Sequence, residues 1–273
     1  MRPLAKIFAV ISSGALRSKD GTEIGFLRLG EGPPLVFVHG SLSVAESWRA
    51  CAELLSDQFT CYLMDRRGRA SSGDAPNYSI EREYEDVAAL LANAGAEASL
   101  FGHSYGAVIA LESALRTPVA RLILYEPPLN AGYAIAAAEI ADYRDALAAK
   151  DPKGALEIAL IRLVGLPREQ FESLSSSPIW DRMVALAPGF VREMAAIDQR
   201  DPSLVRYRAL DVPTLLLAGS ETRHHRSYES AIDGLIRTLR NVVVAEMEGQ
   251  GHIAHLTAPE LLALRIREFL TQD

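Results

Sequence analysis

The segment 98–108, with the sequence ASLFGHSYGAV, carries the pattern that decides the fold. A short apolar run leads into the pentapeptide Gly-His-Ser-Tyr-Gly at positions 102–106, and an apolar stretch with helical spacing follows. This order predicts a strand, a sharp turn and a helix. The turn would hold Ser104 in a strained backbone conformation and requires small residues at Gly102 and Gly106, where strand and helix crowd together. A serine exposed at such a turn is a candidate nucleophile.

The composition is that of an ordinary globular chain. Of the 273 residues, 28 are basic and 35 acidic, and the resulting net charge of -7 gives no electrostatic reason to bind nucleic acid or anionic membranes. No apolar run approaches the roughly 20 residues of a membrane span. The apolar patch at residues 7–11 is too short for a secretion signal. We therefore expect a cytoplasmic protein in which Cys51 and Cys61 are buried core residues.

Short apolar runs alternate with helical patterns in the first half of the chain. A hairpin signal with Asp-Gly at its turn comes first, and apolar runs at 35–38, 60–64, 98–101 and 122–125 follow, most of them trailed by a helical pattern. This rhythm implies right-handed crossovers and a mostly parallel sheet. It resumes near the end of the chain with further strand signals at 213–219 and 242–245.

Between these two parts the rhythm breaks. Residues 133–208 contain only helical patterns, among them 134–149, 152–164 and 188–197. We predict that 1–128 and 209–273 form one core domain and that 129–208 is an all-helical insertion belonging to the same folding unit.

Four short motifs follow the predicted strand ends, and together they resemble those of the α/β-hydrolase superfamily. They are His39-Gly40, Asp65-Arg66-Arg67-Gly68, the Gly-His-Ser-Tyr-Gly pentapeptide and Gly249-Gln250-Gly251-His252. One such motif is a weak signal, but four in the family's order are specific. The resemblance covers nearly the whole chain. It implies an α/β fold with eight strands, helices on both faces of the sheet, a helical cap inserted after strand six and a pocket beneath that cap; it implies no particular substrate.

A neutral serine hydroxyl needs a general base near pH 7. The resemblance implies that His252 is this base and that His39 and His103 have supporting roles. It also implies an oxyanion hole formed by the backbone N–H groups of Ser41 and Tyr105.

The residue that would orient His252 departs from the family's usual pattern. An aspartate is usual three residues after the glycine that ends strand seven, and here that position is Thr222. Two carboxylates could replace it, namely Glu221, one residue out of register, and Glu126, after strand six. Related haloalkane dehalogenases carry a functional carboxylate after strand six. We favour Glu126, because a strand end positions a side chain better than a shifted loop does.

These residues predict a cofactor-independent serine hydrolase that cleaves a small, apolar ester, or a lactone or amide, through an acyl-enzyme on Ser104. We expect no metal, and no nucleic-acid or membrane partner; the oligomeric state stays open. Alternatives are a slow ligand-binding protein whose acid has been lost, and a perhydrolase or lyase that uses the same residues. The charged run 65–69 is expected to close a strand end with solvated, ion-paired charge.

Overall fold

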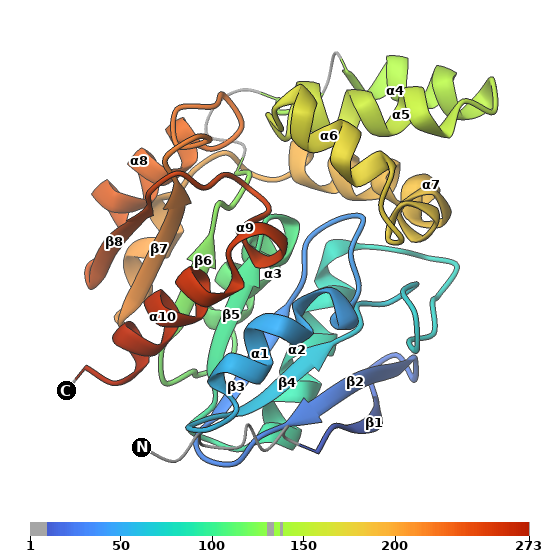
Figure 1. Cartoon of the computed structure of the whole chain (residues 1–273). Helices are drawn as coiled ribbons and strands as arrows, with labels where there is room; N and C mark the ends of the chain where they lie inside the picture. Colours follow the sequence, from blue (N-terminus) through green and yellow to red (C-terminus); the bar gives the residue numbers. More distant parts are fainter. Residues whose placement is uncertain (1–9, 130–133, 137–138, 273) are drawn as a thin grey trace, which may run out of the picture.

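An eight-stranded sheet forms the centre of the molecule in this computed structural model, which describes residues 10–129, 134–136 and 139–272 (Figure 1). The strand order is β1-β2-β4-β3-β5-β6-β7-β8. Strand β2 runs antiparallel to its neighbours β1 and β4, and the remaining pairs are parallel. The strands are β1 (Ser12–Arg17), β2 (Glu23–Leu29), β3 (Pro34–Val38), β4 (Thr60–Met64), β5 (Ser99–His103), β6 (Leu122–Tyr125), β7 (Thr214–Gly219) and β8 (Val242–Met247).

The central strands are short and buried on both faces, as continuous apolar runs in parallel sheets are. Strands β3 to β8 all run in the same direction, so the loops that follow their carboxyl ends lie along one edge of the sheet. These loops carry the motifs singled out from the sequence. Most of the patch at residues 7–11 lies outside the described residues. No helix in the described ranges is long and apolar enough to cross a membrane.

Helices cover both faces of the sheet, and each face has its own apolar core. The helices α1 and α10 pack against each other on one face, and α2 and α3 pack together on the other. Cys51 and Cys61 are free and buried in the first of these cores, as predicted. The helical segments of the core are η1 (Ala45–Trp48), α1 (Arg49–Leu55), α2 (Ile80–Ala94), α3 (Tyr105–Ala114), α8 (Glu229–Thr238), α9 (Ala254–Thr257) and α10 (Pro259–Leu270).

Between β6 and β7 the described residues form helices and no strand. We call these segments the inserted helices: α4 (Glu139–Ala148), α5 (Pro152–Glu157), the π-helix η2 (Ile158–Leu163), α6 (Arg168–Ser175), α7 (Trp180–Asp198) and the 3₁₀ helix η3 (Val205–Ala209). Helices α4, α5, α6 and α7 lie at the top of Figure 1, above the carboxyl ends of the strands. The buried residues of the inserted helices belong to the same apolar cluster as one face of the sheet, including Leu124 and Leu160.

Two predicted helix boundaries within this segment were wrong. Residues Ala134–Ala136 are not helical, and α4 is assigned only from Glu139. Helix α7 does not begin at Pro188 but passes through it. Its buried residues recur every three or four positions from Met183 to Ile197, and this apolar stripe compensates for the backbone hydrogen bond that proline removes.

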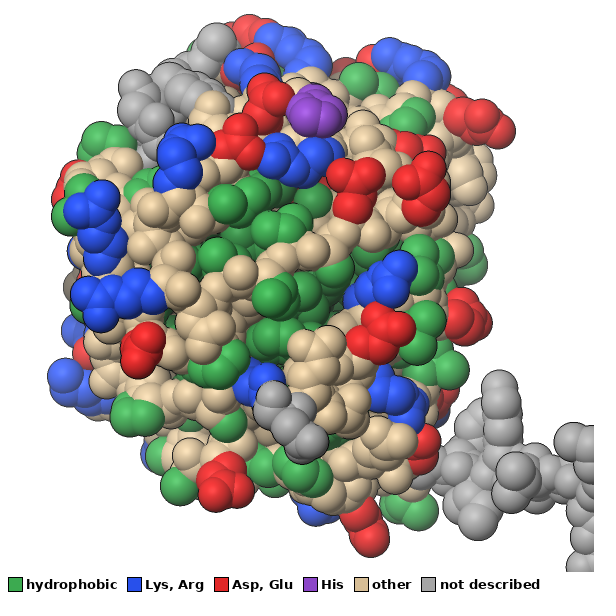
Figure 2. Space-filling model, turned by 90° about the vertical axis from the view of Figure 1, so that its left-hand side faces the viewer, with side chains coloured by type: hydrophobic (Ala, Val, Ile, Leu, Met, Phe, Trp, Pro, Cys, Tyr) green, Lys and Arg blue, Asp and Glu red, His purple; other side chains and the backbone are tan. Residues whose placement is uncertain are grey.

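The sheet ends at the edge strand β8. Figure 2 shows the side of the molecule on which β8 and α8 lie in Figure 1, with hydrophobic side chains gathered near its middle and charged side chains of both signs around them. On β8 itself, Val243 and Val244 are exposed.

A buried carboxylate connects α3 with the end of the inserted segment. Glu112 accepts hydrogen bonds from Arg200, from Arg116 at 2.6 Å, from Arg206 at 3.0 Å and from the Tyr207 hydroxyl at 2.6 Å. Burial by itself would raise the pKa of Glu112, but the guanidinium groups, Arg200 foremost, outweigh it and lower this pKa to about 2. The ionised carboxylate is therefore the form that holds the two segments together.

Acid is expected to weaken this connection. The folded pKa of Glu112 lies below its ordinary value of 4.5, so its contribution to stability is complete above pH 4.5 and is lost as the pH falls towards 2. In urea unfolding measured at a series of pH values, Glu112→Gln should be less stable than wild type at pH 7. It should also lose less stability between pH 4.5 and 2. Parallel pH profiles for the two proteins would contradict this assignment.

Candidate active site

Ser104 lies at the tip of the turn between β5 and α3. Its backbone has φ 54° and ψ −125°, a conformation that a non-glycine residue adopts only under strain. The predicted need for small neighbours is confirmed, because a Cβ on Gly102 would lie 2.4 Å from the Gly106 carbonyl oxygen. One on Gly106 would lie 2.1 Å from that of Val38. The Ser104 N–H donates to the carbonyl of Tyr125 at 2.9 Å, which anchors the turn to β6.

His252 lies in the loop after β8 and is held by its own backbone as well as by its ring. The Nε2–H of His103 donates to the His252 carbonyl at 2.9 Å. The Tyr125 hydroxyl donates to the Gly251 carbonyl and accepts from the Ala254 N–H at 3.3 Å, so it clamps the residues on either side of His252. Burial, followed by the neighbouring His252, lowers the pKa of His103 well below its usual range. His103 is therefore a neutral support for this loop.

Glu126 follows β6 and lies beside His252. Its Oε2 is 2.6 Å from His252 Nδ1, and both side chains are buried. Its Oε1 accepts the Gly219 N–H at 2.8 Å and the Thr222 hydroxyl at 2.5 Å. The Glu126 N–H donates to the carbonyl of Leu217 on β7. Glu126 has φ 46°, so the chain accepts backbone strain here as it does at Ser104.

The structure thus separates the two candidate carboxylates. Glu221 is exposed, and its Oε2 lies 3.4 Å from Gln170 Nε2. Thr222, which occupies the usual acid position, is buried and donates its hydroxyl to Glu126. The strand-seven loop consequently provides hydrogen-bond donors to a carboxylate from strand six. From the sequence, Thr222 indicates only that the usual acid is absent; its role as a donor to the replacement acid depends on the tertiary structure.

The peptide group between Gly40 and Ser41 is fixed from its carbonyl side. The Gly40 carbonyl accepts His39 Nδ1–H at 2.8 Å and Arg66 Nη1–H at 3.2 Å. A Cβ on Gly40 would lie 2.9 Å from the Cβ of Ser104, so this peptide packs directly against the turn that carries the serine. Because the N–H of Ser41 belongs to the same rigid, planar peptide, its direction is fixed too.

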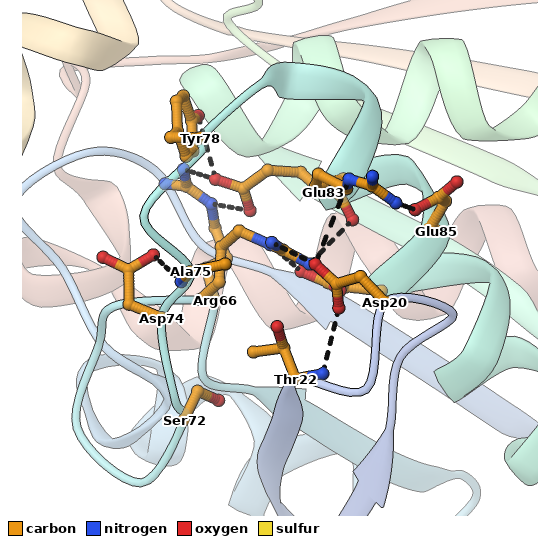
Figure 3. A network of polar contacts seen from close by, with 12 residues as sticks. Asp20, Thr22, Arg66, Ser72, Asp74, Ala75, Tyr78, Glu83 and Glu85 are labelled. Atoms are coloured by element: carbon orange, nitrogen blue, oxygen red, sulfur yellow. Dashed lines mark hydrogen bonds and ion pairs between the residues drawn. The ribbon is translucent and has the colours of Figure 1, made fainter.

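Arg66, which follows β4, connects the Gly40–Ser41 peptide to several other side chains. It makes a bidentate pair with Glu83, at 2.6 and 3.1 Å, and Tyr78 also donates to Glu83 at 3.1 Å (Figure 3). Its guanidinium lies 4.6 Å from the ring centroid of Tyr105. A second carboxylate, Glu193 on α7, accepts from Arg66 and from Arg69, each at 2.7 Å.

The expectation that the run 65–69 is solvated was therefore wrong, although its ion pairing is confirmed. Arg66, Arg67 and Arg69 are all buried. Arg67 pairs with Asp86 at 2.7 Å and with Asp20 at 3.0 Å. Each of these arginines faces a carboxylate of another segment, and such partners cannot be identified from the run itself.

A cavity of about 80 Å³ lies between the strand ends and the inserted helices. Ser104, Ser41 and His252 line it together with apolar residues of the inserted helices, among them Leu160 and Met194. A larger and more open cleft, between α2 and α7, contains neither the serine nor His252. The smaller, more enclosed cavity is thus the one that holds the predicted nucleophile and base.

Tyr228 is a residue of this site that the sequence did not reveal. Its buried ring stacks on that of His252, with the centroids 4.8 Å apart and the planes at 15°. Its hydroxyl donates to the Val164 carbonyl at 3.3 Å, at the end of η2. Tyr228 therefore connects the inserted helices with the imidazole. In the sequence Tyr228 is a single aromatic residue outside any motif, which is too common a feature to be informative.

The three remaining histidines make other contacts, and His225 Nδ1 accepts the Ser227 N–H at 3.3 Å. His224 is exposed and pairs with Glu229, while His255 is buried and stacks on Trp48. In the part of the chain that the structure describes, no group of three or more His, Cys, Asp or Glu residues could hold a metal ion.

Comparison with known proteins agrees with this architecture. Residues 35–265 match the alpha/beta hydrolase family. A solved alpha/beta hydrolase from Sphaerobacter thermophilus is 31% identical, with a TM-score of 0.81, and the match covers 94% of this chain and all of that one. The chain belongs to the alpha/beta hydrolase family. The predictions of the fold class and of the family are confirmed.

Relatives with described activities are more distant or match over less of their length. An N-formylmaleamate deformylase from Pseudomonas putida is 34% identical over 124 residues, which are 43% of this chain and 46% of that protein. The chain thus matches less than half the length of this curated relative. The esterase RhEst1 from Rhodococcus sp. ECU1013 is 23% identical with a TM-score of 0.77, over 96% of this chain and 99% of that one, and shows the shared fold.

Proposed function

We propose that this protein is a serine hydrolase that cleaves a small ester, or a lactone or amide, through an acyl-enzyme on Ser104. The observation that carries the proposal is the buried 2.6 Å contact between Glu126 Oε2 and His252 Nδ1, beside a cavity that Ser104 and His252 both line. A carboxylate on Nδ1 fixes the imidazole tautomer and stabilises the imidazolium that forms when the other nitrogen accepts a proton. No metal or cofactor is part of this proposal.

In the proposed reaction Ser104 Oγ attacks the carbonyl carbon of the substrate while His252 Nε2 accepts the serine proton. The oxyanion of the tetrahedral intermediate accepts hydrogen bonds from the N–H groups of Ser41 and Tyr105. When the intermediate collapses, His252 returns the proton to the departing alcohol or amine. A water molecule then attacks the acyl-enzyme with His252 again as the base, releasing the acid and the free serine.

Two features support the two N–H groups as donors. Tyr105 is the first residue of α3, and the first amides of a helix have no partner within the helix. The Gly40 carbonyl accepts from both His39 and the Arg66 guanidinium, which orients the Ser41 N–H and strengthens its dipole. Removal of one oxyanion donor typically costs about 3 kcal/mol, so this alignment matters to the rate.

We further propose that 129–208 acts as a cap on a core formed by 1–128 and 209–273, within one folding unit. The shared apolar cluster and the placement of the inserted helices over the strand ends support this division. The cap would supply the apolar wall of the cavity and thereby select the substrate.

The ligand-binding alternative rested on Thr222 having replaced the acid. That reason no longer applies, because the Thr222 hydroxyl donates to a carboxylate that contacts His252. We therefore retain the hydrolase as the proposed function.

A fluorophosphonate probe tests the proposed nucleophile. Such probes phosphonylate a serine that an adjacent base activates, so we expect one covalent adduct on the intact protein, located at Ser104 by peptide mass spectrometry. Ser41, Ser43 and Ser47 also line the cavity, and they serve as internal controls for simple proximity. Ser104→Ala should abolish labelling while the thermal unfolding temperature stays close to that of wild type. Absence of an adduct, or an adduct on another serine, would overturn the proposal.

A further inference from the structure

The lining of the cavity beside Ser104 contains one arginine and no lysine. Arg182, near the start of α7, lines it together with mainly apolar residues, and the lining contains no aspartate or glutamate. Arg182 is partly buried. Its guanidinium nitrogens are not among the buried polar atoms that lack a partner, so they remain accessible to an anion.

Arg182 has no such partner within the described parts of the chain. The other arginines around this region each face a carboxylate: Arg66 and Arg69 face Glu193, and Arg192 faces Asp74 at 2.8 Å. Arg182 takes part in no ion pair, hydrogen bond or ring contact there. The residues outside the described ranges contain just one acidic side chain, that of Asp273.

The position of Arg182 adds to the positive potential at this end of the cavity. Ile179, Met183, Phe190 and Met194 also line the cavity, so one side of the 19-residue helix α7 runs along it, and Arg182 lies in the first turn of that side. The partial positive charge of a helix amino terminus favours an anion in the same place as the guanidinium does. The neighbouring first-turn acid, Asp181, is exposed and does not line the cavity.

We propose that Arg182 is a specificity determinant that binds an anionic group, a carboxylate, on the substrate of the hydrolase proposed above. The substrate class is then a small ester or amide of a dicarboxylic acid, or one whose leaving group carries a carboxylate. Its apolar part contacts the side chains of the inserted helices, and its free carboxylate pairs with the planar guanidinium, which suits two parallel hydrogen bonds. The hydrolysis of this substrate rests on the proposed function, whereas the binding of its carboxylate by Arg182 does not.

The test compares the monomethyl and dimethyl esters of succinate, glutarate and adipate in a pH-stat assay. Each pair shares a scissile bond and differs in one charge. We expect wild type to prefer the monomethyl ester of at least one pair, and Arg182→Gln to lower kcat/KM for that ester by about 10- to 100-fold, as loss of a hydrogen-bonded charge does. The dimethyl ester should be unaffected, and Arg182→Lys should retain part of the preference. Arg168→Gln, an exposed arginine of α6 outside the cavity lining, is the matched control.

A binding experiment separates this inference from the proposed reaction. Ser104→Ala protein is titrated with the same ester pairs by calorimetry, with and without Arg182→Gln. Tighter binding of the monomethyl ester that disappears with Arg182→Gln supports the inference, even if wild type hydrolyses neither ester and the proposed function fails. Equal affinity for the members of every pair, or a preference that survives Arg182→Gln, would overturn it while leaving hydrolysis of neutral esters untouched.

Discussion

Replacement of Glu126 by glutamine is expected to lower kcat/KM for an activated ester by about 10⁴-fold, the loss typical when the carboxylate of a serine hydrolase triad becomes an amide. The amide oxygen can still accept the Gly219 N–H and the Thr222 hydroxyl, which both donate to Oε1 in the native protein. The amide nitrogen would then face His252 Nδ1 and donate to it. His252 would carry its proton on Nε2, where it cannot accept one from Ser104.

Glu221→Gln is the matched control for this experiment, since Glu221 is the other carboxylate near the end of β7 and is exposed. We expect it to retain nearly full activity. Thr222→Val should lie between the two, with a loss of about 10- to 100-fold from removal of one hydrogen bond to a charged group. A collapse of activity in Glu221→Gln alone would show that the wrong carboxylate has been assigned.

Replacement of Glu193 by alanine is expected to destabilise the protein by about 3–5 kcal/mol, because it leaves buried arginines without a partner they share. Both Arg66 and Arg69 pair with Glu193 in the native structure, and all three side chains are buried. Burial by itself would raise the pKa of Glu193, but Arg66 and Arg69 outweigh it and lower this pKa to about 2. The carboxylate is thus ionised throughout the neutral range. Urea unfolding at pH 7 would measure the loss.

The same change should also reduce the rate at saturating substrate. Glu193 lies on α7, and Arg66 connects it to the Gly40 carbonyl and so to the Ser41 N–H. Asp142→Ala removes an exposed partner of Arg162 on the inserted helices and should alter stability by less than about 1 kcal/mol. Equal effects of Glu193→Ala and Asp142→Ala on stability would contradict a structural role for the buried network.

Much of the fold could be predicted because it depends on local patterns. The apolar runs of β3 to β6 are buried strands, as their patterns indicate. The glycine, serine and histidine motifs each follow a strand end, so a parallel sheet necessarily brings them to one edge. Boundaries failed where long-range packing overrides local preference, as in α7, whose apolar stripe carries the helix through Pro188.

The sequence by itself determined the family's sheet, the serine at its strained turn and a short choice of partners for His252. Only the tertiary structure placed Glu126 on His252, because the strands that carry them are far apart in the chain and their meeting depends on strand order. The tertiary structure also shows that Thr222, at the usual position of the acid, donates a hydrogen bond to Glu126. The charged run 65–69, expected at the surface, forms a buried ion-paired network. The spacing of residues along the sequence indicates which side chains share a turn or a strand end. Which carboxylate pairs with which cation or imidazole depends on tertiary packing, because a charge that is buried without a partner costs a large free energy of desolvation.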